Sequence, residues 1–309
     1  MILNFMKIAS IDIGTNTVRC LIAQVQDGVL TPKAIYRDII RLGEGLRAKG
    51  ELDPAAFERL TAVLRSYSVY ISGSGCRKVR AVGTSALRDA DRGGSIARAL
   101  NEVLGSPVEV ISGEEEARLT SIGVQAGIGS MEDGLLLDIG GGSTELIRVS
   151  KGTNSWWTSL PAGVVHLTEE LFLDDPPTDR QVDVFKARFR DLLERQRDDG
   201  GKQIAGTAGT PTTLAAIELG IDDYDPTLVN GHVLSLNTIQ DLVKQFLNMT
   251  SDERLTMTGM EKGREDLIVA GSLMVLEVMD RWGFQEMIVS DWGLLEGIAI
   301  DLAGDAGNQ

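Results

Sequence analysis

The chain contains two copies of one local pattern, in which a buried strand ends in aspartate and a glycine-containing turn leads into a second strand. The first copy covers residues 8–25 and has Asp12 at the end of its first strand. The second covers residues 135–149 and has Asp138 at the same place. An apolar run on each side of a polar turn predicts a strand, a tight turn and a strand. A duplicated hairpin of this kind predicts a chain built from two related halves.

The two turns have the composition of a phosphate cradle. The first reads Gly14-Thr15-Asn16-Thr17, and the second reads Gly140-Gly141-Gly142-Ser143-Thr144. Glycine lets backbone N–H groups approach an anion closely, and the hydroxyl groups add further donors. The aspartate at the strand end can hold a cation or a water beside that anion. One such turn alone would be an ordinary hairpin, but two predict halves that close on one phosphate-bearing substrate.

Length and charge limit the partners. At 309 residues, two domains are favoured over one. The formal net charge of −15 disfavours nucleic acid as a partner, because binding a duplex needs a basic surface. A phosphate-rich substrate then needs local positive charge, which a divalent metal and a few clustered arginines would supply. No apolar run approaches the roughly 18 residues of a membrane span, and no signal peptide is evident, so we expect a cytoplasmic protein without membrane contact.

Histidine and cysteine chemistry is limited by number. The chain has only two histidines, His166 and His232, and neither lies near a nucleophile-elbow pattern, so both are expected to be structural. The two cysteines, Cys20 and Cys76, form no disulfide framework and are expected to be buried or incidental thiols.

The alternation of strand and helix patterns predicts an α/β fold. Asp53 and Pro54 form a helix start, with aspartate as N-cap and proline in the first turn. Ser112 and Glu115 fit a capping box for a helix to about residue 126. Further strands are expected at residues 33–42, 78–83, 108–111, 158–161, 203–205 and 286–289. Further helices are expected at 94–104 and 178–198, after 211 and from 294. Turns are expected at 84–88 and 206–211.

Several segments together resemble the exopolyphosphatase / guanosine pentaphosphate phosphohydrolase family of the actin-like ATPase superfamily. The resemblance implies two ribonuclease-H-like domains that flank an interdomain cleft. It implies an N-terminal domain at residues 1–127, a C-terminal domain at 128–293, and a last helix at about 294–309 that packs back on the first domain. The segments are residues 12–17, 83–88, 111–119, 138–145, 160–168, 206–210 and 290–297.

The resemblance implies magnesium- or manganese-dependent hydrolysis of a terminal phosphoanhydride, with release of orthophosphate. Glu116 is the expected general base, because a carboxylate must orient and deprotonate the attacking water. Without the resemblance, the glutamates at 114–116 would only complement a helix dipole. Asp138 is also expected to act in catalysis and to hold the metal, with Asp12 and Glu145 as further candidate ligands.

Substrate-binding roles follow from the same resemblance. Arg88 is expected to clamp a phosphate with two hydrogen bonds, and its alternative is a surface salt bridge. Arg19 and Arg264 would contact a guanosine polyphosphate or the trailing polyphosphate, and either could equally be a solvated surface charge. The complete expected set is Asp12, Gly14, Thr15, Asn16, Thr17, Arg19, Arg88, Gly140, Gly141, Gly142, Ser143, Thr144, Gly209 and Arg264.

Two substrates and two other functions stay open at this point. The substrate is inorganic polyphosphate or guanosine pentaphosphate, with guanosine tetraphosphate as the product or ligand, and the protein is a monomer or a homodimer. One alternative is an actin-like phosphotransferase that uses ATP. The other is a sensor that binds guanosine tetraphosphate without turnover.

Overall fold

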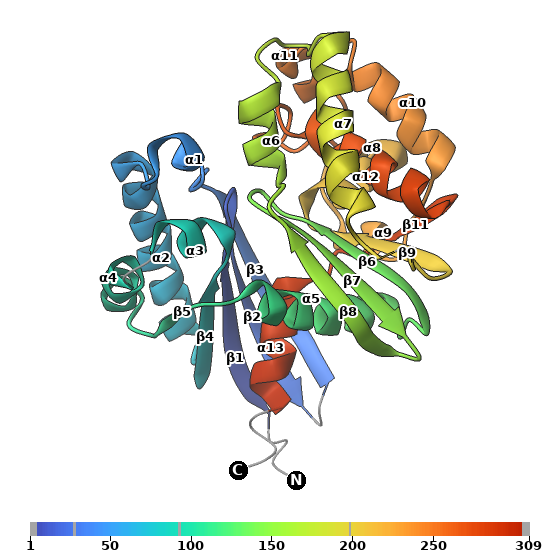
Figure 1. Cartoon of the computed structure of the whole chain (residues 1–309). Coiled ribbons are helices and arrows are strands. Elements are labelled where there is room, and N and C mark those ends of the chain that lie inside the picture. The colour runs from blue at the N-terminus through green and yellow to red at the C-terminus, as the bar shows by residue number, and fades with distance from the viewer. Residues whose placement is uncertain (1–4, 27–28, 92–93, 198, 305–309) are drawn as a thin grey trace. The chain divides into compact units, whose positions relative to one another are not determined.

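The computed structural model describes residues 5–26, 29–91, 94–197 and 199–304, and these residues form two compact units of α/β structure (Figure 1). One unit contains the described residues up to Gly123 together with the final helix, which begins at Leu294. The other unit is the continuous segment Val124–Gly293. The first unit is therefore completed by a segment that comes last in the chain. Residues 305–309 of the predicted last helix lie outside the described residues.

The first unit is built on a five-stranded sheet with strand order β3-β2-β1-β4-β5. Antiparallel pairing joins β1, β2 and β3, whereas β4 is parallel to β1 and β5 is parallel to β4. This is the ribonuclease-H-like order, and it places the predicted hairpin at the centre of the sheet. The strands are β1 (Met6–Ile13), β2 (Thr17–Gln26), β3 (Val29–Ile39), β4 (Lys78–Gly83) and β5 (Val108–Val110).

Helices cover both faces of this sheet because its central strands are apolar on both sides. Ile11 of β1 packs in a core with α2 and α4, whereas Ile8 packs against α13. The predicted start of α2 is confirmed, since the Asp53 carboxylate accepts the N–H of Ala55 at 2.9 Å and Pro54 follows. The helices are α1 (Leu46–Lys49), α2 (Pro54–Ser74), α3 (Ser85–Ala90), α4 (Ser95–Leu104), α5 (Gly113–Ile128) and α13 (Leu294–Gly304).

The second unit repeats this sheet with one strand added. Its order is β10-β11-β9-β6-β7-β8, so β8-β7-β6-β9-β11 corresponds to the five strands of the first unit, and β10 pairs antiparallel with β11. The predicted fold class, α/β with two ribonuclease-H-like sheets, is confirmed. The strands are β6 (Asp133–Ile139), β7 (Thr144–Ser150), β8 (Thr153–Leu160), β9 (Gln203–Thr207), β10 (Val233–Ser235) and β11 (Glu286–Val289).

One large core joins this second sheet to its helices, and α12 is buried along most of its length. Thr178 begins α7 with the complete capping box, in which its hydroxyl accepts the N–H of Gln181. The helices are α6 (Val164–Leu171), α7 (Asp179–Glu194), α8 (Gly209–Leu219), α9 (Pro226–Val229), α10 (Leu236–Phe246), α11 (Ser251–Leu255) and α12 (Ile268–Trp282). None of the helices in the described part of the chain has the length and apolar character of a membrane-crossing segment.

Some sequence predictions need correction. Residues 84–88 were predicted as a turn, but α3 begins at Ser85, because the chain turns into a helix directly after Gly83. Strands β3 and β8 begin earlier than predicted, at Val29 and Thr153, because each continues a hairpin. The predicted helix 178–198 ends at Glu194, and residue 198 lies outside the described residues.

Arg254 is a buried charged residue that joins separate segments of the second unit. Its side chain is 2% exposed, and Nη2 lies 2.7 Å from a carboxylate oxygen of Asp175. Its Nη1 donates to the carbonyls of Phe246 and Met249 at 3.0 and 2.7 Å, and Nε donates to that of Glu265 at 2.7 Å. One guanidinium therefore donates to three backbone carbonyls and one carboxylate from separate segments, although Asp175 also accepts the N–H of Ser251 and the Phe246 carbonyl also accepts that of Met249.

We expect Arg254→Met to lower the free energy of unfolding by about 1–3 kcal/mol, because it leaves the carbonyls of Met249 and Glu265 without their side-chain donor and removes the bond to Asp175. Urea denaturation of the purified variant measures this change. Arg195→Met is the matched control, since Arg195 forms an exposed i,i+4 pair with Asp191 and should cost under about 1 kcal/mol. Equal stability of the two variants would contradict a structural role for Arg254.

Candidate active site

The two predicted hairpin turns have the same backbone geometry. In the first unit, the N–H of Gly14 donates to the carbonyl of Thr17 at 3.0 Å. In the second, the N–H of Gly140 donates to the carbonyl of Ser143 at the same distance, 3.0 Å. In each hairpin, four residues lie between the last two residues that pair across the strands. The two copies therefore share turn length and hydrogen bonding as well as composition.

The first turn is held by the segment that follows β3. The carbonyl of Asn16 accepts the N–H groups of Ile40 and Arg41, both at 2.9 Å, and the carbonyl of Thr15 accepts the N–H of Gly43 at 2.8 Å. The C=O and N–H of one planar peptide unit point in opposite directions. The N–H of Asn16 therefore points away from this segment and is available to a ligand.

The side chain of Asn16 is the clearest sign of a ligand in the first unit. The residue is 7% exposed, yet neither Oδ1 nor Nδ2 has a hydrogen-bond partner among the described residues. A buried polar group without a partner destabilises a protein by about 1–3 kcal/mol and needs an explanation. A bound polyanion with its accompanying water or cation would supply the missing partners.

The second turn is held by the first turn of α6. The carbonyls of residues 140–142 contact the N–H groups of Val164 and Val165 and the Nδ1 of His166, at 3.0, 2.9 and 3.0 Å respectively. Because a carbonyl can only accept, Nδ1 carries the proton and donates. By the same peptide geometry, the N–H groups of residues 141–143 point away from α6. Three successive N–H groups with one orientation form a backbone nest suited to phosphate.

One predicted hydroxyl donor of this turn is already engaged. Thr144 is fully buried, and its Oγ1 donates to the carbonyl of Ala162 at 2.5 Å. The phosphate role of Ser143, which is 6% exposed, stays a prediction.

Gly163 was missed by sequence reasoning and is required for this arrangement. A Cβ atom at Gly163 would lie 2.3 Å from the backbone C and O of Gly141 and from the N of Gly142. The absence of a side chain therefore allows α6 to reach the turn. Gly163 lies within the segment 160–168 that carried the family resemblance, but nothing local in the sequence indicates the close approach.

The aspartates of the two hairpins lie across from residues of opposite charge. Asp12 is paired across β1 and β2 with Arg19, whose Nη2 and Nε lie 2.7 and 3.2 Å from Oδ2. Asp138 is paired across β6 and β7 with Glu145, and the two residues are 8% and 1% exposed. Directly opposed residues have Cβ atoms about 4.5–5.5 Å apart, and two buried carboxylates at that spacing favour a bound cation or a shared proton.

The metal prediction is therefore better supported in the second unit than in the first. The Asp12 carboxylate is already neutralised by Arg19, so its role as a ligand stays a prediction. In the second unit, the hydroxyl of Ser159 donates to Glu145 Oε1 at 2.6 Å and fixes the orientation of that carboxylate.

Glu116 lies in the first turn of α5 and is 7% exposed. Its Oε2 accepts from Nη1 of Arg88 at 2.6 Å, and the same Nη1 donates to the carbonyl of Ile111 at 3.0 Å. Arg88 is on helix α3, so a rigid element holds the guanidinium beside the carboxylate. Both bonds use Nη1, which leaves the Nε and Nη2 side of the guanidinium oriented for another acceptor such as phosphate.

A network of ion pairs anchors the start of α5. The N–H of Glu115 donates to Ser112 Oγ at 3.2 Å, which confirms half of the predicted capping box. The Glu115 carboxylate is instead held by Arg118 and Arg80, and both arginines also bind Asp301 of α13. The hydrogen bond from Arg118, opposed by burial and assisted by Arg80, lowers the pKa of Glu115. The carboxylate next to Glu116 in sequence is thus held in its charged form.

The turn before α8, in the second unit, brings together two further predicted residues, Gly209 and Arg264. Ala208, just before α8, has φ 68° and ψ −165°, a region that only glycine adopts readily, and such strain costs of order 1–3 kcal/mol. Next to it, a Cβ on Gly209 would lie 1.4 Å from Nη1 of Arg264, so the guanidinium packs directly on the glycine. Nε of Arg264 donates to Glu261 at 2.6 Å. A cation at the positive end of a helix favours a nearby anion.

The histidines and cysteines have partners or environments that fit structural roles. His166 is 2% exposed and bonds the second turn, as described above. His232 Nε2 lies 2.6 Å from Glu218. Burial raises the pKa of the Cys20 thiol to about 12, which keeps it in the unreactive protonated form. Cys76 is half-buried and forms no disulfide.

The predicted site residues thus fall into two sets, one in each unit. The first unit contains Asp12, the turn at 14–17, Arg19, Arg88 and Glu116. The second contains Asp138, the turn at 140–144, Glu145, Gly209 and Arg264. Within the first set, the structure joins Asp12 to Arg19 and Arg88 to Glu116. Within the second, it brings Asp138 opposite Glu145 and Arg264 against Gly209.

The sequence matches the profile of the Ppx/GppA phosphatase family over residues 21–306, and the chain belongs to this family. The predicted family is thus confirmed. The curated relatives of the chain carry the names of phosphoanhydride hydrolases, so the prediction of an enzyme of this class is confirmed as well.

Individual relatives support the assignment over the whole chain. The chain is 32% identical to exopolyphosphatase 2 of Mycobacterium tuberculosis over 316 residues, which cover 96% of this chain and 99% of the relative. It is 28% identical to exopolyphosphatase 1 of Mycobacterium bovis, with coverage of 96% and 88%.

Solved structures agree. A Ppx/GppA family member from Aquifex aeolicus is 33% identical and superposes with a TM-score of 0.86, covering 98% of this chain and 99% of that one. An exopolyphosphatase from Cytophaga hutchinsonii is 28% identical, with a TM-score of 0.87 and coverage of 97% and 98%. The actin-like two-domain fold is thereby confirmed.

We expect Gly163→Ala to lower the rate of phosphate release by roughly 10–100-fold, because the added methyl group displaces the backbone of residues 141–142 and misorients the nest. Steady-state phosphate release, with circular dichroism as a check of folding, measures the effect. Gly73→Ala is the matched control, since a Cβ there meets nothing within 4 Å and should leave activity unchanged. Unimpaired turnover by a folded Gly163→Ala protein would show that the nest is not needed.

Proposed function

We propose that this protein is a magnesium-dependent exopolyphosphatase that hydrolyses the terminal phosphoanhydride of inorganic polyphosphate and releases orthophosphate. The observation that carries the proposal is the buried Glu116 carboxylate, which Arg88 holds at 2.6 Å in a chain of a phosphatase family. The names of the curated relatives support polyphosphate as the substrate.

Glu116 acts as the general base in this proposal. Its carboxylate accepts a proton from a water molecule, whose oxygen attacks the terminal phosphorus as the bridging P–O bond breaks. The shortened polyphosphate leaves as an anion, and the water oxygen remains in the orthophosphate. Arg88 has two functions: Nη1 fixes the orientation of Glu116, and the remaining guanidinium donors stabilise negative charge on the transferred phosphoryl group.

The two backbone turns bind phosphate. The N–H groups of residues 141–143 and of Asn16 are preorganised donors, because neighbouring segments have already taken the carbonyls of the same peptide units. Donors that do not reorganise during the reaction stabilise a charged transition state most effectively. Arg19 and Arg264 are the candidate contacts for phosphates farther from the scissile bond.

The donor set of the second unit fits magnesium bound together with substrate. Among the residues that the structure describes, no three histidine, cysteine or carboxylate side chains are grouped to hold a metal. Mg²⁺ characteristically uses one or two carboxylates and completes its shell with substrate oxygens and water. Asp138 and Glu145 would hold the ion in that way, and the ion, when bound, would neutralise charge on the terminal phosphates. Asp12 fits less well because of its bond to Arg19.

Guanosine pentaphosphate is the second candidate substrate, because its terminal linkage is the same phosphoanhydride and hydrolysis gives the tetraphosphate. The guanidinium of Arg264, packed on Gly209, would serve either substrate by providing a cation for a phosphate group away from the scissile bond.

Phosphate release from polyphosphate, guanosine pentaphosphate, ATP and GTP, measured side by side, tests the proposal. We expect turnover of one or both of the first two and little of the nucleoside triphosphates. ATP-dependent transfer to an acceptor would indicate a phosphotransferase instead. Tight binding of guanosine tetraphosphate without hydrolysis of any substrate would indicate a sensor.

Glu116→Gln should lower kcat by about 10²–10⁴-fold with the fold intact, because an amide cannot accept the proton of the attacking water. Glu114→Gln is the control, since Glu114 is exposed in the same helical turn and should retain full activity. Near-normal turnover by Glu116→Gln would remove this residue from the mechanism.

Asp138→Asn should raise the Mg²⁺ concentration needed for half-maximal activity at least about tenfold or abolish turnover, because a neutral amide is a weaker ligand for a hard cation. A magnesium titration of phosphate release measures this, and chelator should abolish wild-type activity until Mg²⁺ or Mn²⁺ is added back. Asp223→Asn, at an exposed position of the same unit, serves as control. Full activity in excess chelator contradicts the proposed metal dependence.

A further inference from the structure

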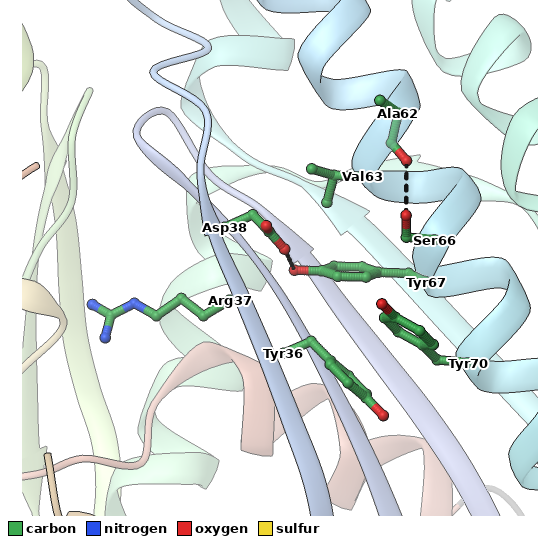
Figure 2. A pocket seen from close by; sticks show the side chains of 8 residues that line it. All are labelled: Tyr36, Arg37, Asp38, Ala62, Val63, Ser66, Tyr67 and Tyr70. Carbon is green, nitrogen blue, oxygen red and sulfur yellow. Dashed lines mark hydrogen bonds between the residues drawn. The ribbon is translucent and has the colours of Figure 1, made fainter. Parts of the chain in front are cut away.

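A cavity of about 390 Å³ lies in the first unit between helix α2 and the edge strand β3 (Figure 2). Tyr36 of the strand and Tyr67 and Tyr70 of the helix line it. The chain has only four tyrosines, so three of the four meet at this one place. None of the candidate active-site residues is part of the lining, and the proposed reaction therefore does not account for it.

Two of the three rings are stacked, and Tyr70 remains accessible, whereas Tyr67 is buried. Tyr36 and Tyr70 stack with ring centroids 4.4 Å apart and planes inclined by 22°, and Tyr67 is tilted by 41° relative to Tyr36 at 6.1 Å. Tyr70 is 42% exposed, which presents aromatic surface to anything that enters. The face of an aromatic ring carries partial negative charge and attracts cations.

Two charged residues line the cavity, Arg37 and the exposed Asp38, and the carboxylate is the one that reaches the rings. The Asp38 carboxylate accepts the hydroxyl of Tyr67 at 2.8 Å, and Figure 2 shows Arg37 pointing away from the rings. Burial, together with the bond to Asp38, raises the pKa of Tyr67, so its hydroxyl stays protonated and donates. Arg59, one helical turn before Val63, is not part of the lining, and its Nε donates to the carbonyl of Ile40 at 2.9 Å.

The remaining lining is small and partly apolar. Ala62 and Val63 offer methyl groups, and the hydroxyl of Ser66 donates to the carbonyl of Ala62 at 3.3 Å. The cavity thus combines a carboxylate, aromatic faces and aliphatic surface, and its volume falls within the range of small-molecule sites, roughly 300–1,000 Å³.

We propose that this cavity binds a linear polyamine, an organic cation in which methylene chains separate several ammonium groups. One ammonium group would donate to Asp38, a second would lie on the ring face of Tyr70, and the methylenes would pack on Val63. The net charge of −15 raises the local concentration of any such cation. A small inorganic cation would gain the attraction of the carboxylate but not the contacts with the rings and methyl groups.

Isothermal titration calorimetry of the full chain with spermidine, without polyphosphate, tests this proposal. We expect saturable binding at one site. Asp38→Asn should weaken the affinity roughly fivefold to tenfold, because it removes a charge-assisted hydrogen bond that solvent partly screens. Tyr70→Ala should weaken it about twofold to fivefold, as expected for one exposed cation–π contact. If Asp38→Asn fails to fold, the substitution at the exposed Tyr70 keeps the test decisive.

Asp241→Asn is the control, because Asp241 is exposed on α10 of the other unit and pairs only with the exposed Lys244 among the contacts described. It should leave spermidine affinity unchanged. An equal loss of affinity in Asp241→Asn and Asp38→Asn would show diffuse attraction to an acidic surface and overturn the proposal. So would the absence of saturable binding, equal competition by Mg²⁺ at matched ionic strength, or displacement of spermidine by an uncharged nucleoside.

Discussion

The planarity of the peptide bond determines the orientation of the N–H groups in both proposed phosphate-binding turns. A carbonyl that is bonded on one side of a turn directs the neighbouring N–H to the other side. In the first unit, the segment after β3 takes the carbonyls of Thr15 and Asn16, and in the second unit α6 takes those of residues 140–142. Different supporting elements therefore produce the same result from a duplicated hairpin. The donors are oriented before substrate arrives, which is the requirement for electrostatic stabilisation without reorganisation.

The duplication is symmetric in its backbone and asymmetric in its charges. The position opposite the strand-end aspartate is Arg19 in the first unit and Glu145 in the second. The difference between arginine and glutamate at this one position therefore gives the first hairpin a neutral pair of side chains and makes the second a candidate cation site. Glu116, the proposed general base, is also in the first unit, where α3 and the ion pairs of Arg80 and Arg118 hold the start of α5.

The sequence predicted the features that depend on neighbouring residues. Both hairpins, the Asp53 and Thr178 helix starts and the α/β alternation are local patterns, and all were confirmed. The pairing of Asp12 with Arg19 could also have been predicted, because a turn of known length sets the register of a hairpin. The helix that carries Arg88 was mistaken for a turn, since Gly83, Thr84 and Ser85 are typical of turns.

Other features could not be predicted because they depend on tertiary packing. The close approach of Gly163 to the second turn joins segments that are distant in sequence. The burial of the Asn16 side chain without a hydrogen-bond partner among the described residues also depends on tertiary packing. Helix α12 was not assigned, because it is buried on most sides and so lacks the one-sided apolar periodicity that marks an amphipathic helix.

The position of α13 has a consequence for protein synthesis. The helix beginning at Leu294 completes the first unit by covering apolar residues such as Ile8 and Leu21 on one face of its sheet. On the ribosome, those residues emerge early, but the helix that covers them is made only after the whole of the second unit. The second unit is one continuous segment and can finish folding sooner. The first unit therefore cannot complete its fold until the helix at Leu294 has been synthesised. Until then, an incompletely translated chain exposes an aggregation-prone apolar surface to chaperones and proteases.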